Sequence, residues 1–167
     1  MAAGYFTPAY VGLGSNLGHP VAQLRGALAA LGGLPGTRLV ARSALYRNPP
    51  MGPPDQPEYV NAVAALLTTL TAGDLLRALQ QIESDFGRKR GEQRWGPRTL
   101  DLDLLLYGDL QLASDELILP HPGLATRPFV LIPLSEIAPA LRLPGGKLIA
   151  SLVTAVGDSG LERLEAG

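Results

Sequence analysis

Two aspartates, Asp101 and Asp103, stand inside an otherwise apolar segment, TLDLDLLLYG. In a β-strand, side chains alternate between faces at about 3.3 Å per residue, so both carboxylates point the same way, roughly 7 Å apart. Two ionised carboxylates on one face repel each other and are costly to bury, and a shared pair of Mg²⁺ ions removes both problems. The spacing therefore predicts a magnesium site. The opposite face is expected to enter a core through Leu100, Leu102, Leu104 and Leu106.

Five cations precede this strand within eleven residues: Arg88, Lys89, Arg90, Arg94 and Arg98. The interleaved glycines and Pro97 favour a loop over a helix. For an isolated Asp-x-Asp, a solvated strand face is the better interpretation. A carboxylate–metal centre beside a cationic loop is instead typical of polyphosphate transfer, because that catalysis is mostly positioning and charge neutralisation. The neighbourhood therefore favours the metal site.

Tyr59 and Asn61 lie two residues apart in a predicted strand, so their side chains share one face. The strand follows a segment, residues 48–57, that holds five prolines in ten residues and is expected to be an ordered or gated loop. An aromatic face with one amide suits a flat heterocycle, since an amide pairs both a donor and an acceptor. The alternative is a packed ring and a satisfied structural amide.

Three other side chains do not decide the chemistry by themselves. His121 lies between two prolines, six residues before Arg127, and a structural histidine is the commoner case. Phe129 alone would be a core residue. Trp95 is the only tryptophan and is either a latch that is buried on closure or a packing anchor.

Length and composition set the class of protein. A chain of 167 residues is predicted to form a single domain, 1–167, that buries about 70% of its unfolded surface. The lack of cysteine excludes disulfides and thiolate metal sites and fits a reducing compartment. No signal peptide or membrane span is expected, so we predict a soluble, cytoplasmic protein. A net charge of −1 argues against general nucleic-acid affinity.

Periodicity predicts the elements that position these residues. Strands are expected at 9–14, 38–47 and 58–68 and at the aspartate segment, and helices at 20–31, 75–86 and 148–156. Thr71 to Asp74 resembles a capping box variant. Two short helical pieces are expected within 119–139. The order β-α-β-β-α-β predicts a ferredoxin-like α+β sandwich, an antiparallel sheet with helices on one face.

The segment GLGSNLG, Gly12 to Gly18, follows a strand and opens a helix, which superficially indicates phosphate binding. It lacks the Walker lysine and does not match the dinucleotide pattern. We therefore expect a tight strand-to-helix turn, capped by Ser15 or Asn16.

Four blocks of the sequence resemble the 6-hydroxymethyl-7,8-dihydropterin pyrophosphokinase family of folate biosynthesis. They are AYVGLGSNLG, NPPMGPPDQPEYVNAV, GRKRGEQRWGPRTLDLDLLLYG and LPHPGLATRPFVLIPLSEIAP. The resemblance implies transfer of pyrophosphate from ATP to the hydroxymethyl oxygen of the reduced pterin, giving AMP. It implies two Mg²⁺ ions, held by Asp101 and Asp103, that bridge the triphosphate and the attacking hydroxyl.

The same resemblance implies the substrate contacts. Tyr59 and Phe129 match the rings that sandwich the pterin, and Asn61 matches its hydrogen-bonding partner. The remaining pterin-site residues it implies are Asn48, Pro49, Met51 and Trp95. The implied ATP-site residues are Gln80, Glu83, Arg90, Arg98, Leu104, His121 and Arg127. Arg88 and Arg98 match loop arginines that neutralise phosphate charge in catalysis.

Asn48 departs from the Thr or Ser expected before the double proline, which leaves its side-chain contact open. Two other classes compete: a magnesium-dependent phosphodiesterase or nuclease, which normally needs further metal ligands, and a nucleic-acid-binding module, which leaves the aspartates unexplained. ATP and the pterin are the expected partners, with no nucleic acid and no membrane. A monomer is the working expectation, although the sequence does not set the oligomeric state.

Overall fold

The computed structural model describes residues 5–48, 58–87, 100–158 and 160–164. In chain order the elements are β1 (Thr7–Ser15), α1 (Pro20–Gly32), β2 (Thr37–Arg42), β3 (Tyr46–Asn48), β4 (Tyr59–Thr68), α2 (Ala72–Asp85), β5 (Asp101–Tyr107), β6 (Leu112–Ala113), β7 (Ile118–Leu119), α3 (Pro128–Ile137), α4 (Ile149–Val156) and β8 (Glu162–Arg163). Within these ranges, none of the helices has both the length and the apolar character needed to cross a membrane.

The main sheet has the strand order β5-β1-β4-β3-β8, and β2 also pairs with β4. Every pairing in it is antiparallel. The predicted antiparallel sheet of a ferredoxin-like α+β sandwich is therefore confirmed. β1 lies at the centre, between β4 and β5, so residues of these three strands are side by side.

The strand predicted at 38–47 is divided into β2 and β3. Between them, Ser43 N donates to Val63 O and Val63 N donates to Ser43 Oγ, both at 2.9 Å. The serine hydroxyl thus takes a place that a backbone carbonyl occupies in a regular ladder. Because a side-chain hydroxyl replaces a backbone carbonyl at this position, the regular strand is interrupted but the segment stays bonded to β4.

The two long helices follow the predicted patterns. α1 begins at Pro20, where a missing N–H is harmless, and ends before Gly33. α2 begins after Thr71, whose hydroxyl accepts a hydrogen bond from Asp74 N at 3.1 Å, as the capping box variant predicted. Their buried apolar stripes face the sheet through Leu24, Ala27, Leu28 and Leu31 of α1 and Leu75, Leu79 and Ile82 of α2.

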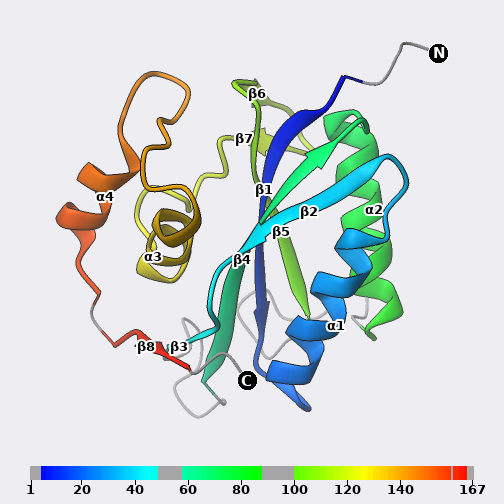
Figure 1. The fold of residues 1–167 in the computed structure, drawn as a ribbon, viewed down its shortest axis with the longest axis horizontal. Helices are drawn as coiled ribbons and strands as arrows, with labels where there is room; N and C mark the ends of the chain where they lie inside the picture. Colours follow the sequence, from blue (N-terminus) through cyan, green and yellow to red (C-terminus); the bar gives the residue numbers. More distant parts are fainter. Residues whose placement is uncertain (1–4, 49–57, 88–99, 159, 165–167) are drawn as a thin grey trace.

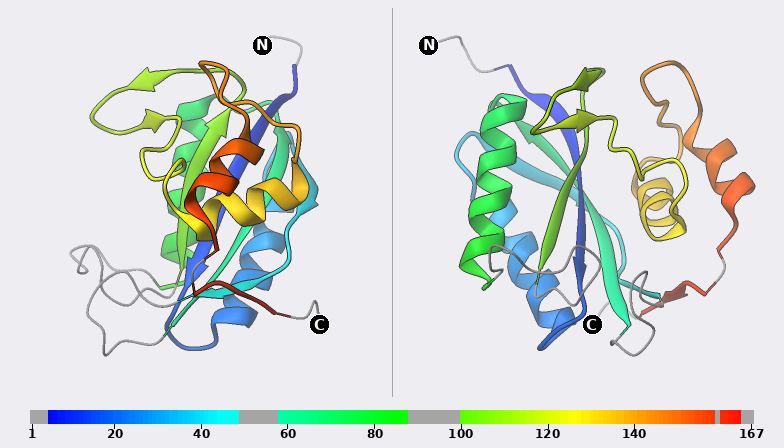
Figure 2. Two further views of the ribbon diagram at one scale, coloured as in Figure 1. Left: turned by 90° about the vertical axis from the view of Figure 1, so that its left-hand side faces the viewer. Right: turned by 180° about the vertical axis from the view of Figure 1, so that it is seen from behind.

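Helices cover both faces of the sheet, whereas the sequence predicted one. α1 and α2 pack on one face, and α3 and α4 lie on the other (Figures 1 and 2). Leu131 and Leu134 of α3 and Ile149 of α4 are fully buried there, with Val63 of β4 and Leu105 of β5. The second face is apolar enough at these positions to need its own cover.

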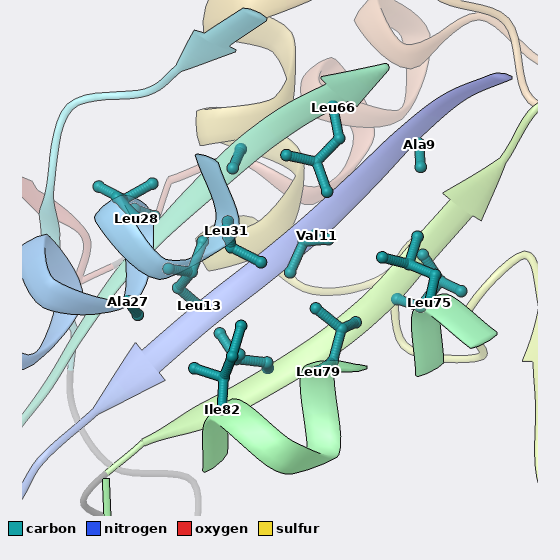
Figure 3. Close-up of a cluster of buried hydrophobic side chains, with 14 of the residues drawn as sticks. Ala9, Val11, Leu13, Ala27, Leu28, Leu31, Leu66, Leu75, Leu79 and Ile82 are labelled. Atoms are coloured by element: carbon teal, nitrogen blue, oxygen red, sulfur yellow. The ribbon is translucent and has the colours of Figure 1, made fainter. Parts of the chain in front are cut away.

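The core beneath α1 and α2 is the larger of the two apolar clusters. Figure 3 shows Val11 and Leu13 of β1 among side chains that come from both helices, including Leu31 and Leu79. Burial of such aliphatic side chains is worth about 1.5–3 kcal/mol each before the entropy of ordering them is counted. This face fixes the positions of β1, β4 and β5.

β5 contains a bulge that the sequence analysis did not anticipate. The register with β1 runs from Leu106 opposite Tyr10 to Leu104 opposite Val11, so Leu105 is an extra residue. Leu104 packs beneath α1 and α2 as predicted, but both Leu105 and Leu106 pack beneath α3 and α4. The prediction that Leu106 shares the face of Leu104 is therefore wrong.

Two further expectations need correction. Gly12 to Ser15 continue β1 rather than forming a turn, and α1 is preceded by His19, which makes no side-chain cap within the described residues. The predicted cap by Ser15 is thus wrong, because its buried hydroxyl has no hydrogen-bond partner among the described residues, and the cap by Asn16 stays a prediction. Within 119–139 only α3 is helical, because residues 122–126 form turns.

Candidate active site

A cavity of about 320 Å³ lies on the face of the sheet that α3 covers. Its floor comes from β1, β4 and β5, and its other walls come from residues 121–123 and from the beginning of α3. Eight of the residues named as site candidates in the sequence line it, seven of them being Asn48, Tyr59, Asn61, Asp101, Asp103, His121 and Phe129. Arg127, the residue just before α3, lines it as well.

Strand register explains how these side chains meet. Asp101 pairs with Gly14 and Asp103 with Gly12, while Gly14 also pairs with Asn61 on the other side of β1. Directly paired residues on neighbouring antiparallel strands point to the same face. Two carboxylates from β5 and an amide from β4 therefore flank a strip of β1 that carries no side chains.

Gly14 is needed for this arrangement. A Cβ atom at Gly14 would lie 2.9 Å from Asn61 Oδ1, closer than real Cβ contacts allow, whereas one at Gly12 would meet Leu105 at an ordinary 3.5 Å. The glycine thus makes room for the amide of Asn61. These two glycines were interpreted from the sequence as part of a turn, so their place in the site was missed.

Asn48 and Asn61 form a buried amide pair. Asn61 Nδ2 donates a hydrogen bond to Asn48 Oδ1, and Asn61 is 5% exposed and Asn48 7%. β3 pairs with β4 so that Asn48 lies directly opposite Tyr59. The Asn48 side chain thus orients the neighbouring amide, and its contact with a substrate stays a prediction.

Tyr59 and Phe129 reach the cavity from different layers of the fold. Tyr59 begins β4 in the sheet, and Phe129 lies in the first turn of α3 above it. Both rings are partly buried. A cavity lined by one aromatic residue from each layer and by an amide at its floor can take a flat, polar ring.

His121 lies close to one of the aspartates. Its Nε2 atom is 3.8 Å from Asp103 Oδ1, and its Nδ1 atom accepts a hydrogen bond from Gly123 N at 3.0 Å. Burial lowers the pKa of His121, Asp103 opposes this shift, and Arg127 lowers the pKa further. Acceptance at Nδ1 places the proton of the neutral ring on Nε2, which therefore faces the carboxylate as a donor.

Arg127 depends on a second glycine that the sequence analysis missed. A Cβ at Gly123 would lie 2.4 Å from Arg127 Cζ, so the guanidinium occupies the space a side chain would need. The guanidinium also lies 5.8 Å from the centre of the Phe129 ring, within cation–π range. The Pro-Gly dipeptide at 122–123 was the only sequence signal for this close approach.

The donor set suits magnesium. Asp101 and Asp103 both line the cavity, and among the described residues no larger cluster of histidine, cysteine and acidic side chains forms a metal site. Mg²⁺ usually binds proteins through one or two carboxylates and takes its other ligands from water and substrate phosphates. Two carboxylates facing an open cavity therefore fit Mg²⁺ that arrives with a polyphosphate.

Three candidates lie away from the described cavity. Glu83 is buried on α2, and its Oε2 atom accepts a hydrogen bond from Leu102 N at 2.8 Å, so it holds the backbone of β5. Leu104 is in the core beneath α1 and α2, and Gln80 is exposed on α2. Their contacts with a nucleotide stay a prediction.

The remaining candidates lie outside the described residues. They are Pro49, Met51, Arg88, Arg90, Trp95 and Arg98. The proline-rich and cationic segments predicted to flank the aspartates fall in the same ranges. Their roles stay predictions.

Comparison with known proteins points to one activity. Residues 10–139 match the profile of the family described as 7,8-dihydro-6-hydroxymethylpterin-pyrophosphokinase (HPPK). A Pseudomonas aeruginosa protein named 2-amino-4-hydroxy-6-hydroxymethyldihydropteridine pyrophosphokinase is 54% identical over 93% of this chain and 95% of its own length. A Haemophilus influenzae protein of the same name is 48% identical over 93% of this chain and 97% of its own length.

Solved structures show the same fold at low identity. A crystal structure of an HPPK-DHPS in complex with substrates has a TM-score of 0.75 and 11% identity over 95% of this chain and 46% of that chain. Wild-type Plasmodium falciparum HPPK-DHPS has a TM-score of 0.72 and 13% identity over 98% of this chain and 49% of that chain. The present chain thus spans about half the length of those structures.

Proposed function

The chain belongs to the 7,8-dihydro-6-hydroxymethylpterin-pyrophosphokinase family, and on this basis we propose that the described cavity is its active site. The enzyme transfers pyrophosphate from ATP to 6-hydroxymethyl-7,8-dihydropterin in folate biosynthesis. The observation that carries the proposal is the meeting of a carboxylate pair with two aromatic residues and an amide in one cavity.

The pterin is proposed to lie between Tyr59 and Phe129. Stacking on two rings holds a flat bicyclic compound without selecting it, and selection then falls to hydrogen bonds at its edge. Asn61, oriented by Asn48, is the group we place at that edge. Backbone groups near Pro49 and Met51, together with Trp95, are proposed to complete the site.

Asp101 and Asp103 are proposed to hold two Mg²⁺ ions. When bound, the ions neutralise the triphosphate and polarise the phosphoryl group that is attacked. The carboxylates themselves fix where the triphosphate lies relative to the pterin hydroxyl. Their position on β5, which is paired along its length with the inner strand β1, favours a rigid placement.

The remaining residues act on the phosphate chain and the nucleotide. The pterin oxygen attacks the β-phosphorus, and the bond from that phosphorus to the oxygen it shares with the α-phosphate breaks, so AMP leaves. Arg127 and the Nε2–H of His121 are proposed to contact phosphate oxygens, because both residues line the cavity, and Arg88, Arg90 and Arg98 are proposed to add positive charge in the transition state. Gln80, Glu83 and Leu104 are proposed to border the nucleotide, with Glu83 acting through the β5 backbone.

We further propose that residues 1–167 act as one monomeric catalytic domain. The family match over residues 10–139 and the relatives of similar length support the single domain. A cytoplasmic location is proposed because ATP is the co-substrate and because the chain has no cysteine to oxidise. Neither a nuclease nor a nucleic-acid-binding module is favoured by an observation at the cavity.

The activity is tested by incubating the protein with MgATP and 6-hydroxymethyl-7,8-dihydropterin and separating the nucleotides. We expect AMP in equal amount to the pyrophosphorylated pterin, and no AMP without pterin or with EDTA. Asp103→Asn keeps the size of the side chain and removes its charge, and it serves as the inactive control. Formation of ADP, or hydrolysis that does not require pterin, would contradict the proposal.

A further inference from the structure

Glu136 of α3 has a set of hydrogen bonds that the proposed mechanism does not use. Its carboxylate accepts from Ala44 N, at 3.0 Å to Oε2 and 3.2 Å to Oε1, and from the Tyr46 hydroxyl at 2.6 Å to Oε1. Arg163 of β8 lies 3.7 Å from Oε2. Only 27% of the Glu136 side chain is exposed, and these four residues are not among the described residues that line the cavity.

Tyr46, at one end of the Glu136 hydrogen bonds, lies directly beside the cavity wall that Tyr59 and Asn61 form on the sheet. Tyr46 is buried on β3, two residues before Asn48, and it pairs directly with Asn61 on β4. Directly paired residues have Cβ atoms about 4.5–5.5 Å apart and point to the same face. A displacement of Tyr46 would therefore shift both amides of the Asn48–Asn61 pair.

The other end lies on the helix that supplies the opposite wall. Glu136 follows Phe129 by seven residues, close to two turns, so both side chains lie on the same side of α3. Arg127, which immediately precedes the helix, also lines the cavity. α3 thus carries cavity residues at its beginning and an anchor to β3 near its end.

The apolar contacts of α3 do not set its position as sharply. Leu131 and Leu134 are fully buried against the sheet, but burial of aliphatic side chains is non-directional and tolerates small sliding. Hydrogen bonds to a carboxylate are short and directional, and they are stronger than neutral ones. The three bonds of Glu136 are therefore the contacts that define the distance from α3 to β3.

We propose that Glu136 is a positioning residue that, through Tyr46 and Ala44, fixes the width of the slot between Phe129 on α3 and the Tyr59–Asn61 wall on the sheet. This inference rests on the proposed function, because that slot is the proposed pterin site. A flat ring stacked on both sides gains contact only at one spacing, since dispersion is lost rapidly over gaps of about 0.5–1 Å. Loss of the anchor should therefore weaken pterin binding far more than nucleotide binding, because Arg127, the proposed phosphate contact beside α3, precedes the helix and has a long, flexible side chain that can follow a small shift.

The experiment compares Glu136→Gln and Tyr46→Phe with the unmodified protein. The first change retains the size of the side chain but leaves one acceptor oxygen, and the second removes only the hydroxyl. Calorimetry with 6-hydroxymethylpterin, and separately with a magnesium complex of a non-hydrolysable ATP analogue, gives both affinities. We expect the pterin Kd to rise about tenfold in Glu136→Gln and about threefold in Tyr46→Phe, with the Kd of the ATP analogue within about twofold.

Thr71→Ala is the matched control for lost stability. It removes the hydrogen bond that caps α2, which lies on the opposite face of the sheet, and should cost a comparable drop in Tm. Its pterin Kd should stay at the value of the unmodified protein. Steady-state kinetics should agree, with a raised KM for the pterin and a near-normal KM for ATP in the two anchor variants only.

Several results would overturn the inference. Normal pterin affinity in both anchor variants would make Glu136 a structural residue only, as would equal losses for the pterin and the ATP analogue or an equal pterin loss in Thr71→Ala. If Glu136→Gln does not fold, Tyr46→Phe decides alone, because it keeps the packed ring. Failure of the proposed function is a distinct result, since the unmodified protein would then form no AMP.

Discussion

The two faces of the sheet differ in the side chains that they present. One face lies beneath α1 and α2, and the other lies beneath α3 and α4. The first presents Val11, Leu13 and Leu102 to apolar helix stripes. The second has a smaller apolar cluster, and beside it Gly12 and Gly14 line the cavity. Both faces belong to the same strands, so alternation alone distributes apolar and polar side chains between them.

The same strands therefore stabilise the fold through one face and carry the candidate site on the other. The face beneath α1 and α2, here called the apolar face, holds β1, β4 and β5 in register. The face beneath α3 and α4 carries the cavity beside its apolar cluster and is here called the polar face. It can therefore hold closely spaced carboxylates and residues without side chains while the fold is kept. Substitutions on the two faces should consequently change different measurements.

Replacing Asp101 or Asp103 by Ala should lower kcat by about 10³-fold or more, because each change removes a proposed metal ligand where phosphate charge must be neutralised. The Tm measured without magnesium should be unchanged or raised, since like-charge repulsion is relieved. AMP formation and thermal unfolding are the two measurements. A large loss of Tm in both variants would show that the polar face supports the fold as well.

Leu79→Ala and Leu105→Ala compare the two faces at equal burial, since both side chains are fully buried. Each should lower the free energy of unfolding by about 2–5 kcal/mol. Only Leu105→Ala should also lower kcat/KM at a temperature where both variants are folded, because Leu105 packs beside Gly12 and its carbonyl accepts from His121 N at 3.0 Å. Equal activity in the two variants would mean that the faces are not functionally distinct.

Gly14→Ala should weaken pterin binding about tenfold, because the new methyl group would collide with Asn61 Oδ1 and displace the amide pair. Gly12→Ala adds the same group at ordinary contact distance and should have a smaller effect. Titration of both variants with 6-hydroxymethylpterin tests this ranking. The same affinity in both would remove the special role of Gly14.

The smallest expected effect is on the pH dependence of stability without magnesium. The pKa of His121 in the folded protein lies below its ordinary value of 6.5, so between these two values the unfolded chain binds more protons. The free energy of unfolding should therefore fall as the pH drops through that window. Above the window His121 is neutral in both states, so it should not change the free energy of unfolding. Urea unfolding of His121→Asn should show a weaker dependence of stability on pH in that window.

Much of the apolar face could be predicted because its signals are local. The spacing of Leu24, Leu28 and Leu31 marks a helix stripe, and Thr71 marks the beginning of the next helix. The shared face of Asp101 and Asp103 follows from alternation and is confirmed by their common place in the cavity.

The features that were not predicted depend on contacts between distant segments. In the run Leu104–Leu106 every residue is apolar, so the pattern gives no sign of where alternation breaks. The interruption at Ser43 depends on a hydrogen bond to Val63, twenty residues away. Helical segments were predicted where α3 and α4 lie, but α3 is short and contains Pro133, so its pattern does not show that it covers the second face of the sheet.

The site was predicted unevenly for a related reason. Charged and aromatic side chains indicate chemistry directly, whereas Gly14 and Gly123 contribute by having no side chain, and their value is visible only once Asn61 and Arg127 are placed beside them. Glu136 has an ordinary helical context in the sequence. Its partners lie about ninety residues earlier in the chain.

The bulge in β5 divides that strand into two stretches whose alternation runs out of phase. The aspartates belong to the stretch before Leu105, and Tyr107, whose hydroxyl donates to Leu70 O, belongs to the one after it. Insertion or loss of one residue inverts every later position in a continuous strand. Here the extra residue separates the two stretches, so the far end of β5 can be tied to the segment that leads into α2 without setting the face to which the two aspartates point.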